Sequence, residues 1–388
     1  MWKFKFLGDR FFAFSTNLFG FFAVIDPANT LFGLKTPTFL LFLLLVALKF
    51  KPHFSNLRIV ALLIILQFVS CSFGLLIGME FDSGINKQYI LFYFLLLIIC
   101  WSYKIDLLPS IIWGSFVVSV MTIIGYITIM MDPDFKLLIY HFSEDHGTIL
   151  MTGERTFLGV TFYALFYRSL PLVTIPAAIY FNKFLDEKTH RKKNFLISLI
   201  FLTSLFMGGN RAMLLGVFII IMIPIYLKYK RLLVFNVLII IVILFGLIIA
   251  YLAITDKEEA STMVKTAHLI SYSDYFSRYW YTLLFGTGAG SMFFSKGIDA
   301  MTPITEWTYL DILRMNGVAG LTLFLTFLFK PIIKNWKRRE IRYWSKVSSG
   351  YILYMFLAGS NPNIFCSTGI LVIIFLYSYS ENLKYRMT

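Results

Sequence analysis

The sequence predicts an all-α fold, a polytopic membrane bundle of about twelve transmembrane helices with a large folded loop between the ninth and tenth. Of its 388 residues, 58% are hydrophobic and 14% charged, and the mean hydropathy of +0.75 is outside the range of soluble domains. Apolar runs of the ~20 residues that cross a bilayer core recur between short polar breaks. These runs are continuous, whereas a strand of a membrane barrel would alternate lipid-facing and lumen-facing residues.

The predicted spans together form one integral membrane domain over residues 1–388. Lys3, Lys5 and Arg10 precede the first apolar run without a small-residue cleavage site, so we expect a retained anchor rather than a cleaved signal peptide. In chain order the predicted spans cover residues 10–28, 32–50, 57–79, 86–103, 109–131, 157–181, 195–208, 211–227, 232–254, 308–330, 347–360 and 364–380.

The basic residues set the topology. With a cytoplasmic N-terminus, the inner segments hold 24 of the 35 basic residues. Because cytoplasmic loops carry an excess of lysine and arginine, both termini are expected in the cytoplasm. The formal charge of +14 would indicate a nucleic acid partner in a soluble protein. Here topology explains it, and no nucleic acid is expected.

Two outer segments are longer than a turn, residues 132–156 and 255–307. A connection of about 50 residues is either functional or disordered. Residues 255–307 are rich in Tyr, Trp and Phe, which does not suit a solvated linker. We therefore expect this segment to fold onto the bundle as a cap.

Eleven basic residues remain outside the inner segments, and five of them are arginines. A charge at the centre of a membrane helix costs ~2.5 to 3.5 kcal/mol, so such residues indicate function. Guanidinium groups that face one cavity suit a pyrophosphate or another anion. The alternative for each is a side chain that only reaches the interface. The five are Arg155, Arg168, Arg211, Arg278 and Arg314.

Two stretches combine glycine with a candidate ligand contact. In "GGNRAMLLG", residues 208–216, the glycine pair allows a tight turn, and the start of the next helix would add its dipole to the charge of Arg211. "FGTGAGS", residues 285–291, contains Gly288 and Gly290 but lacks the lysine and threonine of a Walker motif. It is either a flexible turn or a close backbone approach to a substrate.

Two polar stretches hold candidate acid, base or metal ligands. "HFSEDH", residues 141–146, is better explained as a solvated loop than as a metal site. In "TEWTYLDILRMNGVAGL", residues 305–321, Glu306 precedes the tenth span and Tyr309 follows one turn on. Glu306 at a dry membrane edge suits a general base. The alternative is that Glu306 caps the helix and Asp311 pairs with Arg314, three residues on.

These last stretches, taken in order with a late "GSNPNIFCSTG", resemble the Wzy-type O-antigen polymerases, which are related to the O-antigen ligases. The motif order and spacing match over roughly residues 200–380, and the first half matches as generic membrane helices. The resemblance implies a GT-C-like glycosyltransferase of the bacterial inner membrane, with its active site facing the periplasm.

The resemblance also implies the reaction. A growing glycan leaves undecaprenyl diphosphate and is attached to a sugar hydroxyl of the next lipid-linked repeat unit, in lipopolysaccharide biosynthesis. No cofactor and no metal is implied. The implied partners are the undecaprenyl-diphosphate-linked oligosaccharide, membrane lipid, and a flippase and chain-length regulator of the same pathway.

The resemblance assigns roles to individual residues. Arg211 and Arg278 would hold the donor pyrophosphate, and Glu306 would take the proton of the acceptor hydroxyl. The ligases carry a histidine before "YL" in the segment that matches residues 305–321, and this sequence has none. Aromatic residues of the cap would line the sugar path or form an interfacial belt. Further substrate contacts are expected from Arg155, Arg314, Tyr309, Gly288 and Gly290, and the aromatic residues are Tyr272, Tyr275, Tyr279, Trp280 and Tyr281.

Two alternatives stay open, a flippase or transporter of the lipid-linked oligosaccharide and an O-antigen ligase. A transporter should place its charges along a path through the spans and keep its outer loops short. This chain concentrates them on the outer face beside a long loop, which favours an enzyme.

Overall fold

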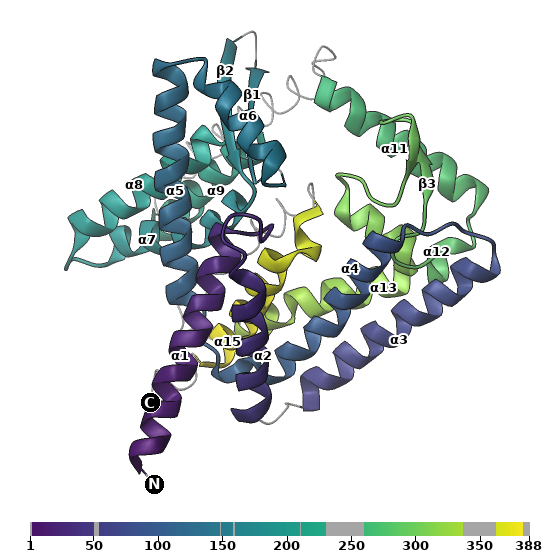
Figure 1. Ribbon diagram of the computed structural model, residues 1–388, viewed down its shortest axis with the longest axis horizontal. Coiled ribbons are helices and arrows are strands. Elements are labelled where there is room, and N and C mark those ends of the chain that lie inside the picture. The colour runs from purple at the N-terminus through teal and green to yellow at the C-terminus, as the bar shows by residue number, and fades with distance from the viewer. Residues whose placement is uncertain are drawn as a thin grey trace.

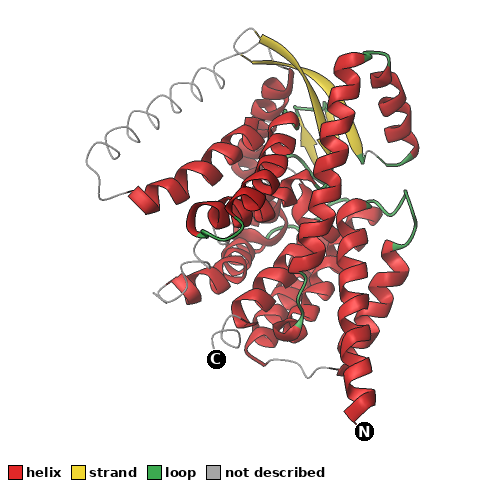
Figure 2. Ribbon diagram, turned by 90° about the vertical axis from the view of Figure 1, so that its left-hand side faces the viewer, coloured by secondary structure: helices red, strands yellow, loops and turns green. Residues whose placement is uncertain are grey.

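The computed structural model describes residues 2–49, 54–147, 149–157, 160–209, 211–229, 260–336 and 362–382. Helices dominate, and the described strands form two small hairpins (Figures 1 and 2). The all-α prediction is therefore confirmed.

The helices follow the apolar runs of the sequence. The α-helices are α1 (Trp2–Ile25), α2 (Lys35–Lys49), α3 (Phe54–Leu76), α4 (Ser83–Leu95), α5 (Leu108–Met131), α6 (Phe135–Asp145), α7 (Thr174–Asp186), α8 (Arg191–Met207), α9 (Arg211–Tyr229), α11 (Ala260–Arg278), α12 (Thr282–Phe285), α13 (Thr308–Trp336) and α15 (Ser367–Asn382). Three 3-10 helices are η1 (Leu96–Lys104), η2 (Leu170–Val173) and η3 (Pro362–Phe365). The strands are β1 (Leu150–Phe157), β2 (Val160–Tyr167), β3 (Phe293–Ser295) and β4 (Ala300–Thr302).

Within the described ranges, four helical stretches are long and apolar enough to cross a membrane: Asn56–Leu76, Ser83–Trp101, Leu108–Met131 and Thr308–Ile333. They coincide with four of the twelve predicted spans. Helices α2, α8 and α15 also fall on predicted spans, but they have 15, 17 and 16 residues, short of the ~20 that a bilayer core requires. The predicted spans 232–254 and 347–360 lie outside the described residues.

The predicted span at residues 157–181 is wrong. Residues 160–167 form β2, which pairs antiparallel with β1, and the chain then continues through η2 into α7. Arg155 of β1 lies opposite Phe162 of β2 in this register. Residues 160–167 are rich in phenylalanine and tyrosine, which favour a strand, and an apolar run of this kind does not by itself distinguish a strand from a helix.

Small residues bring α1, α5 and α8 into close contact. A Cβ on Gly114 of α5 would lie 2.7 Å from the Val24 Cβ of α1. Ser204 of α8 donates a hydrogen bond to Ser119 Oγ of α5 over 2.9 Å. Close approach through glycine and serine is typical of helices that pack within a membrane.

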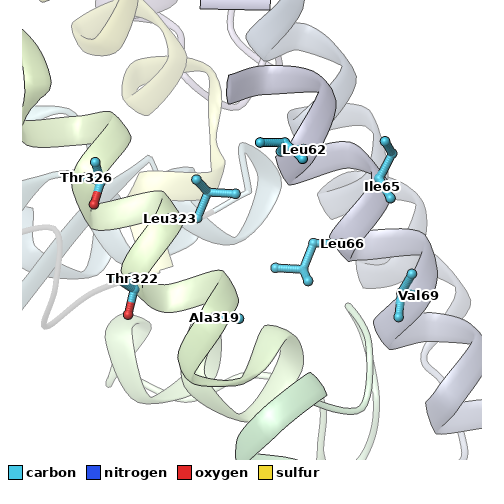
Figure 3. A pocket seen from close by; sticks show the side chains of 8 residues that line it. All are labelled: Leu62, Ile65, Leu66, Val69, Ala319, Thr322, Leu323 and Thr326. Carbon is cyan, nitrogen blue, oxygen red and sulfur yellow. The ribbon is translucent and has the colours of Figure 1, made fainter. Parts of the chain in front are cut away.

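An apolar groove of about 520 Å³ separates α3 from α13 (Figure 3). Leu66 of α3 and Leu323 of α13 point into it, and Leu62 and Ile65 are more than half exposed. Among the described residues, the groove lining contains no charged side chain, and its polar residues are Thr322 and Thr326. This composition is expected of a surface that faces lipid hydrocarbon.

Candidate functional site

Residues 260–307 fold into a unit that we call the cap. It consists of α11, the single turn of α12 and the β3–β4 hairpin (Figure 1). Tyr272 and Tyr275 of α11 and Phe293 of β3 are buried together in an apolar cluster of their own. The side of the membrane that the cap faces stays a prediction.

A cleft of about 370 Å³ opens between α11 and the β3–β4 hairpin. The contributing residues of α11 recur every three or four positions, so they share one face of the helix. Met79, which follows α3, also lines the cleft. The lining side chains used below are Asp274, Tyr275 and Arg278 of α11, Tyr279 directly after it, and Phe293 and Lys296 of the hairpin.

The charged groups of the cleft are the ion pair of Lys296 with Asp274 and the guanidinium of Arg278. Lys296 Nζ lies 2.5 Å from Asp274 Oδ2, and both side chains are about half exposed. Arg278 ends α11 and is exposed, and among the residues that the structure describes it makes neither an ion pair nor a hydrogen bond. Its guanidinium fork is therefore open to an anionic ligand.

Aromatic rings form the floor of the cleft. The ring centroids of Tyr275 and Tyr279 lie 5.3 Å apart, and those of Tyr275 and Phe293 lie 5.9 Å apart in an edge-on arrangement. Burial raises the pKa of Tyr275, so its hydroxyl stays protonated at physiological pH. The cleft thus combines apolar ring surface with a cation and a carboxylate, a mixture typical of small-molecule sites.

A buried polar network lies beneath this cleft. Arg314 is fully buried and donates to Ser291 O over 2.6 Å and to Pro303 O over 2.6 Å. Asp311 accepts from Tyr272 over 2.6 Å and from the Thr305 amide over 2.8 Å. Its Oδ1 lies 3.4 Å from Arg314 Nη2, so the predicted Asp311–Arg314 pair is present. These bonds favour a structural role for Arg314 over a ligand contact.

Glu306 lies outside the cleft lining. Its carboxylate is 3.2 Å from Lys265 Nζ, and both side chains are partly exposed. Tyr309, on the first turn of α13, is partly buried against the main core. The structure therefore brings Arg278 to the cleft but not Glu306 or Tyr309.

The glycine-rich stretch 285–291 approaches helices of the bundle rather than a cavity. Gly288 has φ +86°, and a Cβ there would lie 2.5 Å from Cys71 Cα on α3. Gly290 has φ +79° and faces the Asn86 backbone on α4 at 2.8 Å. The stretch thus lies close to α3 and α4, and the predicted substrate contacts of Gly288 and Gly290 stay a prediction.

The same stretch completes a break in α13. Gly317 interrupts that helix with φ +67°, which leaves carbonyls of the preceding turn without helical partners. Thr287 N donates to Arg314 O over 3.0 Å, and Gly288 N donates to Met315 O over 2.7 Å. A discontinuous helix in a membrane protein needs such replacement bonds.

The other predicted arginines are placed by their backbone. Arg211 begins α9, shortly after Gly209, whose φ is +61°. Arg155 lies in β1. The side chains of Arg155 and Arg211 lie outside the described part of the structure, so their predicted contact with an anion stays a prediction.

The stretch 141–146 belongs to the end of α6 and its cap. His141 Nδ1 lies 3.7 Å from Glu144 Oε2, and both side chains are well exposed. Among the described residues, no three side chains of His, Cys, Asp or Glu converge as metal ligands would.

Sequence reasoning did not single out Asp274 or Lys296. Lys296 is one of the eleven basic residues outside the inner segments, and that was the signal which could have found it. Asp274 carries no comparable signal, because its place follows from the packing of α11 against the hairpin. Comparisons of the chain with protein families, with curated proteins and with solved structures found no match.

Proposed function

We propose that this protein is a membrane glycosyltransferase that polymerises oligosaccharides linked to undecaprenyl diphosphate at the periplasmic face of the bacterial inner membrane. The observation that carries the proposal is the cap cleft, where Arg278 has no partner among the described residues and stands beside Tyr275, Tyr279 and Phe293. The four apolar spans support a substrate that reaches the protein from the bilayer.

The chemistry needs a fixed positive charge. The oxygen of the acceptor hydroxyl attacks the anomeric carbon of the donor sugar, and the bond from that carbon to the diphosphate oxygen breaks. The leaving diphosphate becomes more negative as this bond lengthens. Arg278 would stabilise that charge, and the loss of one preorganised donor of this kind typically costs about 10² to 10³ in rate.

The hydroxyl proton must pass to a base. Two carboxylates are candidates: Glu306, from the resemblance, and Asp274, which lines the cleft. Each is paired with a lysine, Glu306 with Lys265 at 3.2 Å and Asp274 with Lys296 at 2.5 Å.

The break in α13 does not favour the transporter alternative. Broken helices of transporters expose free carbonyls or helix ends to a substrate or ion. Here the carbonyls of Arg314 and Met315 accept hydrogen bonds from the stretch 285–291.

The proposal is tested in a strain that lacks the chromosomal gene and carries variants on a plasmid. Arg278→Gln should insert normally and yield lipopolysaccharide with a single repeat unit, as the empty strain does. Arg278→Lys keeps the charge but loses the fork, so we expect short chains. Arg211→Ala tests the second predicted arginine by the same gel.

Lys136→Gln is the matched control, because Lys136 is paired with Glu154 at 2.8 Å and does not line the cleft. A normal ladder of chain lengths from Arg278→Gln would exclude the cleft as the active site. Core without any repeat unit in the deletion strain would indicate a flippase or ligase instead. Asp274→Asn and Glu306→Gln then identify the base, since only one should abolish elongation.

A further inference from the structure

A second cavity, of about 490 Å³, is lined by residues of α1, α2, α4 and α15. It shares no lining residue with the cap cleft. Its polar end contains Lys35, at the start of α2, and Arg168, directly after β2. Both belong to the basic residues that the positive-inside pattern leaves unexplained. Its volume falls within the range of ligand pockets, about 300 to 1,000 Å³.

The polar end is held in shape by hydrogen bonds. Asn29 Oδ1 accepts from the amides of Lys35 over 3.0 Å and Thr36 over 3.3 Å, which caps the start of α2. The two carboxylate oxygens of Asp26 accept from the amides of Thr30 and Phe32, each over 2.9 Å. The turn that carries Lys35 is therefore fixed by its own side chains.

Two long-range bonds hold this turn to the segment that carries Arg168. Thr30 Oγ1 donates to His146 O over 2.7 Å, and the hydroxyl of Tyr167 donates to Ile25 O. Arg168 itself donates from Nη1 to Gly147 O over 3.3 Å. The two cations thus face one cavity although they are distant in the sequence.

The rest of the cavity is apolar and follows membrane helices. Phe19 of α1, Phe39 of α2, Leu91 and Leu95 of α4 and Ile370 of α15 contribute to its wall. Leu91 belongs to the candidate span Ser83–Trp101 and is 57% exposed, so this wall continues into the lipid-facing surface of α4. A cationic end and an apolar wall suit an anion attached to a hydrocarbon chain.

We infer that this cavity binds the phosphate end of an anionic lipid, with Lys35 and Arg168 on the phosphate and the helical wall on the first carbons of the chain. Two lipids share this chemistry, a polyprenyl phosphate and an acidic phospholipid. The inference does not depend on the glycosyl transfer proposed above, because it concerns binding alone.

Cys366 provides a native reporter. It lines the cavity and is half-buried. The full chain is placed in nanodiscs of phosphatidylcholine, and alkylation of Cys366 by N-ethylmaleimide is followed by peptide mass mapping. Farnesyl phosphate should slow this alkylation in a saturable manner. Phosphatidylglycerol added to the disc tests whether an acidic phospholipid protects Cys366. Inorganic pyrophosphate tests whether an anion without a hydrocarbon chain protects it.

Lys35→Met and Arg168→Met should each raise the half-protecting concentration of farnesyl phosphate at least about tenfold, as expected for the loss of one charge-assisted hydrogen bond. Leu91→Trp should weaken the binding of farnesyl phosphate more than the binding of pyrophosphate. Lys87→Met is the control. Lys87 is the neighbour of Gln88, which lines the cavity, but Lys87 itself does not line it.

Equal protection by pyrophosphate and farnesyl phosphate would overturn the lipid part of the inference. Unchanged protection in both cation variants, or no protection by either lipid, would overturn the site itself. Elution of each variant at the normal volume in size exclusion shows that it is folded. Normal binding in a protein that fails to polymerise glycan would refute the proposed function and leave this site intact.

Discussion

Replacing Gly288 by alanine separates a packing role of the glycine-rich stretch from a ligand-binding role. Gly288 combines φ +86° with a Cβ position 2.5 Å from Cys71 Cα and 2.9 Å from Cys71 N. Both obstacles are backbone atoms of α3, which cannot rotate away as a side chain could. The substitution should therefore displace the stretch and its bonds to α13.

The magnitude follows from two terms. An alanine in the left-handed region costs roughly 1 to 2 kcal/mol. Carbon atoms prefer a separation of about 3.5 to 4.0 Å, so a contact of 2.5 Å requires a backbone shift, and overpacking of this kind costs typically 1 to 3 kcal/mol. We expect Gly288→Ala to lower the free energy of unfolding by about 2 to 5 kcal/mol.

Two other glycines serve as matched controls. Gly33 has φ +66° with no atom within 4 Å of its Cβ position, so Gly33→Ala should cost only the conformational term of roughly 1 to 2 kcal/mol. Gly153 has neither feature, so Gly153→Ala should be near neutral. Unfolding of the purified proteins in mixed detergent, followed by tryptophan fluorescence, gives the ranking. A Gly288→Ala protein as stable as Gly33→Ala would refute the packing argument.

Two further predictions concern the cap. Tyr272→Phe removes the hydroxyl that donates to Asp311 over 2.6 Å, which should cost about 1.5 to 3 kcal/mol in the same unfolding assay; a loss below about 0.5 kcal/mol would contradict it. Burial lowers the pKa of His268 below 6.5, so the unfolded chain binds its proton first as the pH falls through that value, and the cap should lose stability below about pH 6.5. Lower protection factors of α11 amides at low pH, after correction for the intrinsic exchange rate, would support this if His268→Gln abolishes the change; identical pH profiles of the two proteins would contradict it.

Helices were predictable from long apolar runs of the sequence, because a single segment within the bilayer must form its own backbone hydrogen bonds. Residues 57–79, 86–103, 109–131 and 308–330 are such runs, and each coincides with an apolar helix. Residues 157–181 show the limit, because β2 obtains its hydrogen bonds from β1, a partner that hydropathy cannot reveal. Strand preference of the phenylalanine and tyrosine residues in 160–167 was the signal that length alone concealed.

The site was predictable only where one helix carries it. Tyr275 and Arg278 of α11 are three residues apart, so they share a face of this helix whatever the rest of the chain does. Lys35 and Arg168 meet because distant segments pack together, through bonds such as that of Thr30 with His146 O. The glycines of 285–291 predicted either a flexible turn or a close approach to a substrate, and only the structure shows that the close neighbours are Cys71 and Asn86.

The first two turns of α4 connect the glycine-rich stretch of the cap with the second cavity. The Asp82 amide donates to Gly290 O over 2.9 Å, and Asn86 Nδ2 donates to Ala289 O over 2.6 Å, and both acceptors belong to the glycine-rich stretch of the cap. Two residues on, Gln88 lines the cavity and donates to Phe365 O over 3.3 Å. The first two turns of α4 therefore contact both the glycine-rich stretch and a wall of the second cavity. Transport by alternating access requires one bundle to move against another around its site, which these shared contacts would oppose.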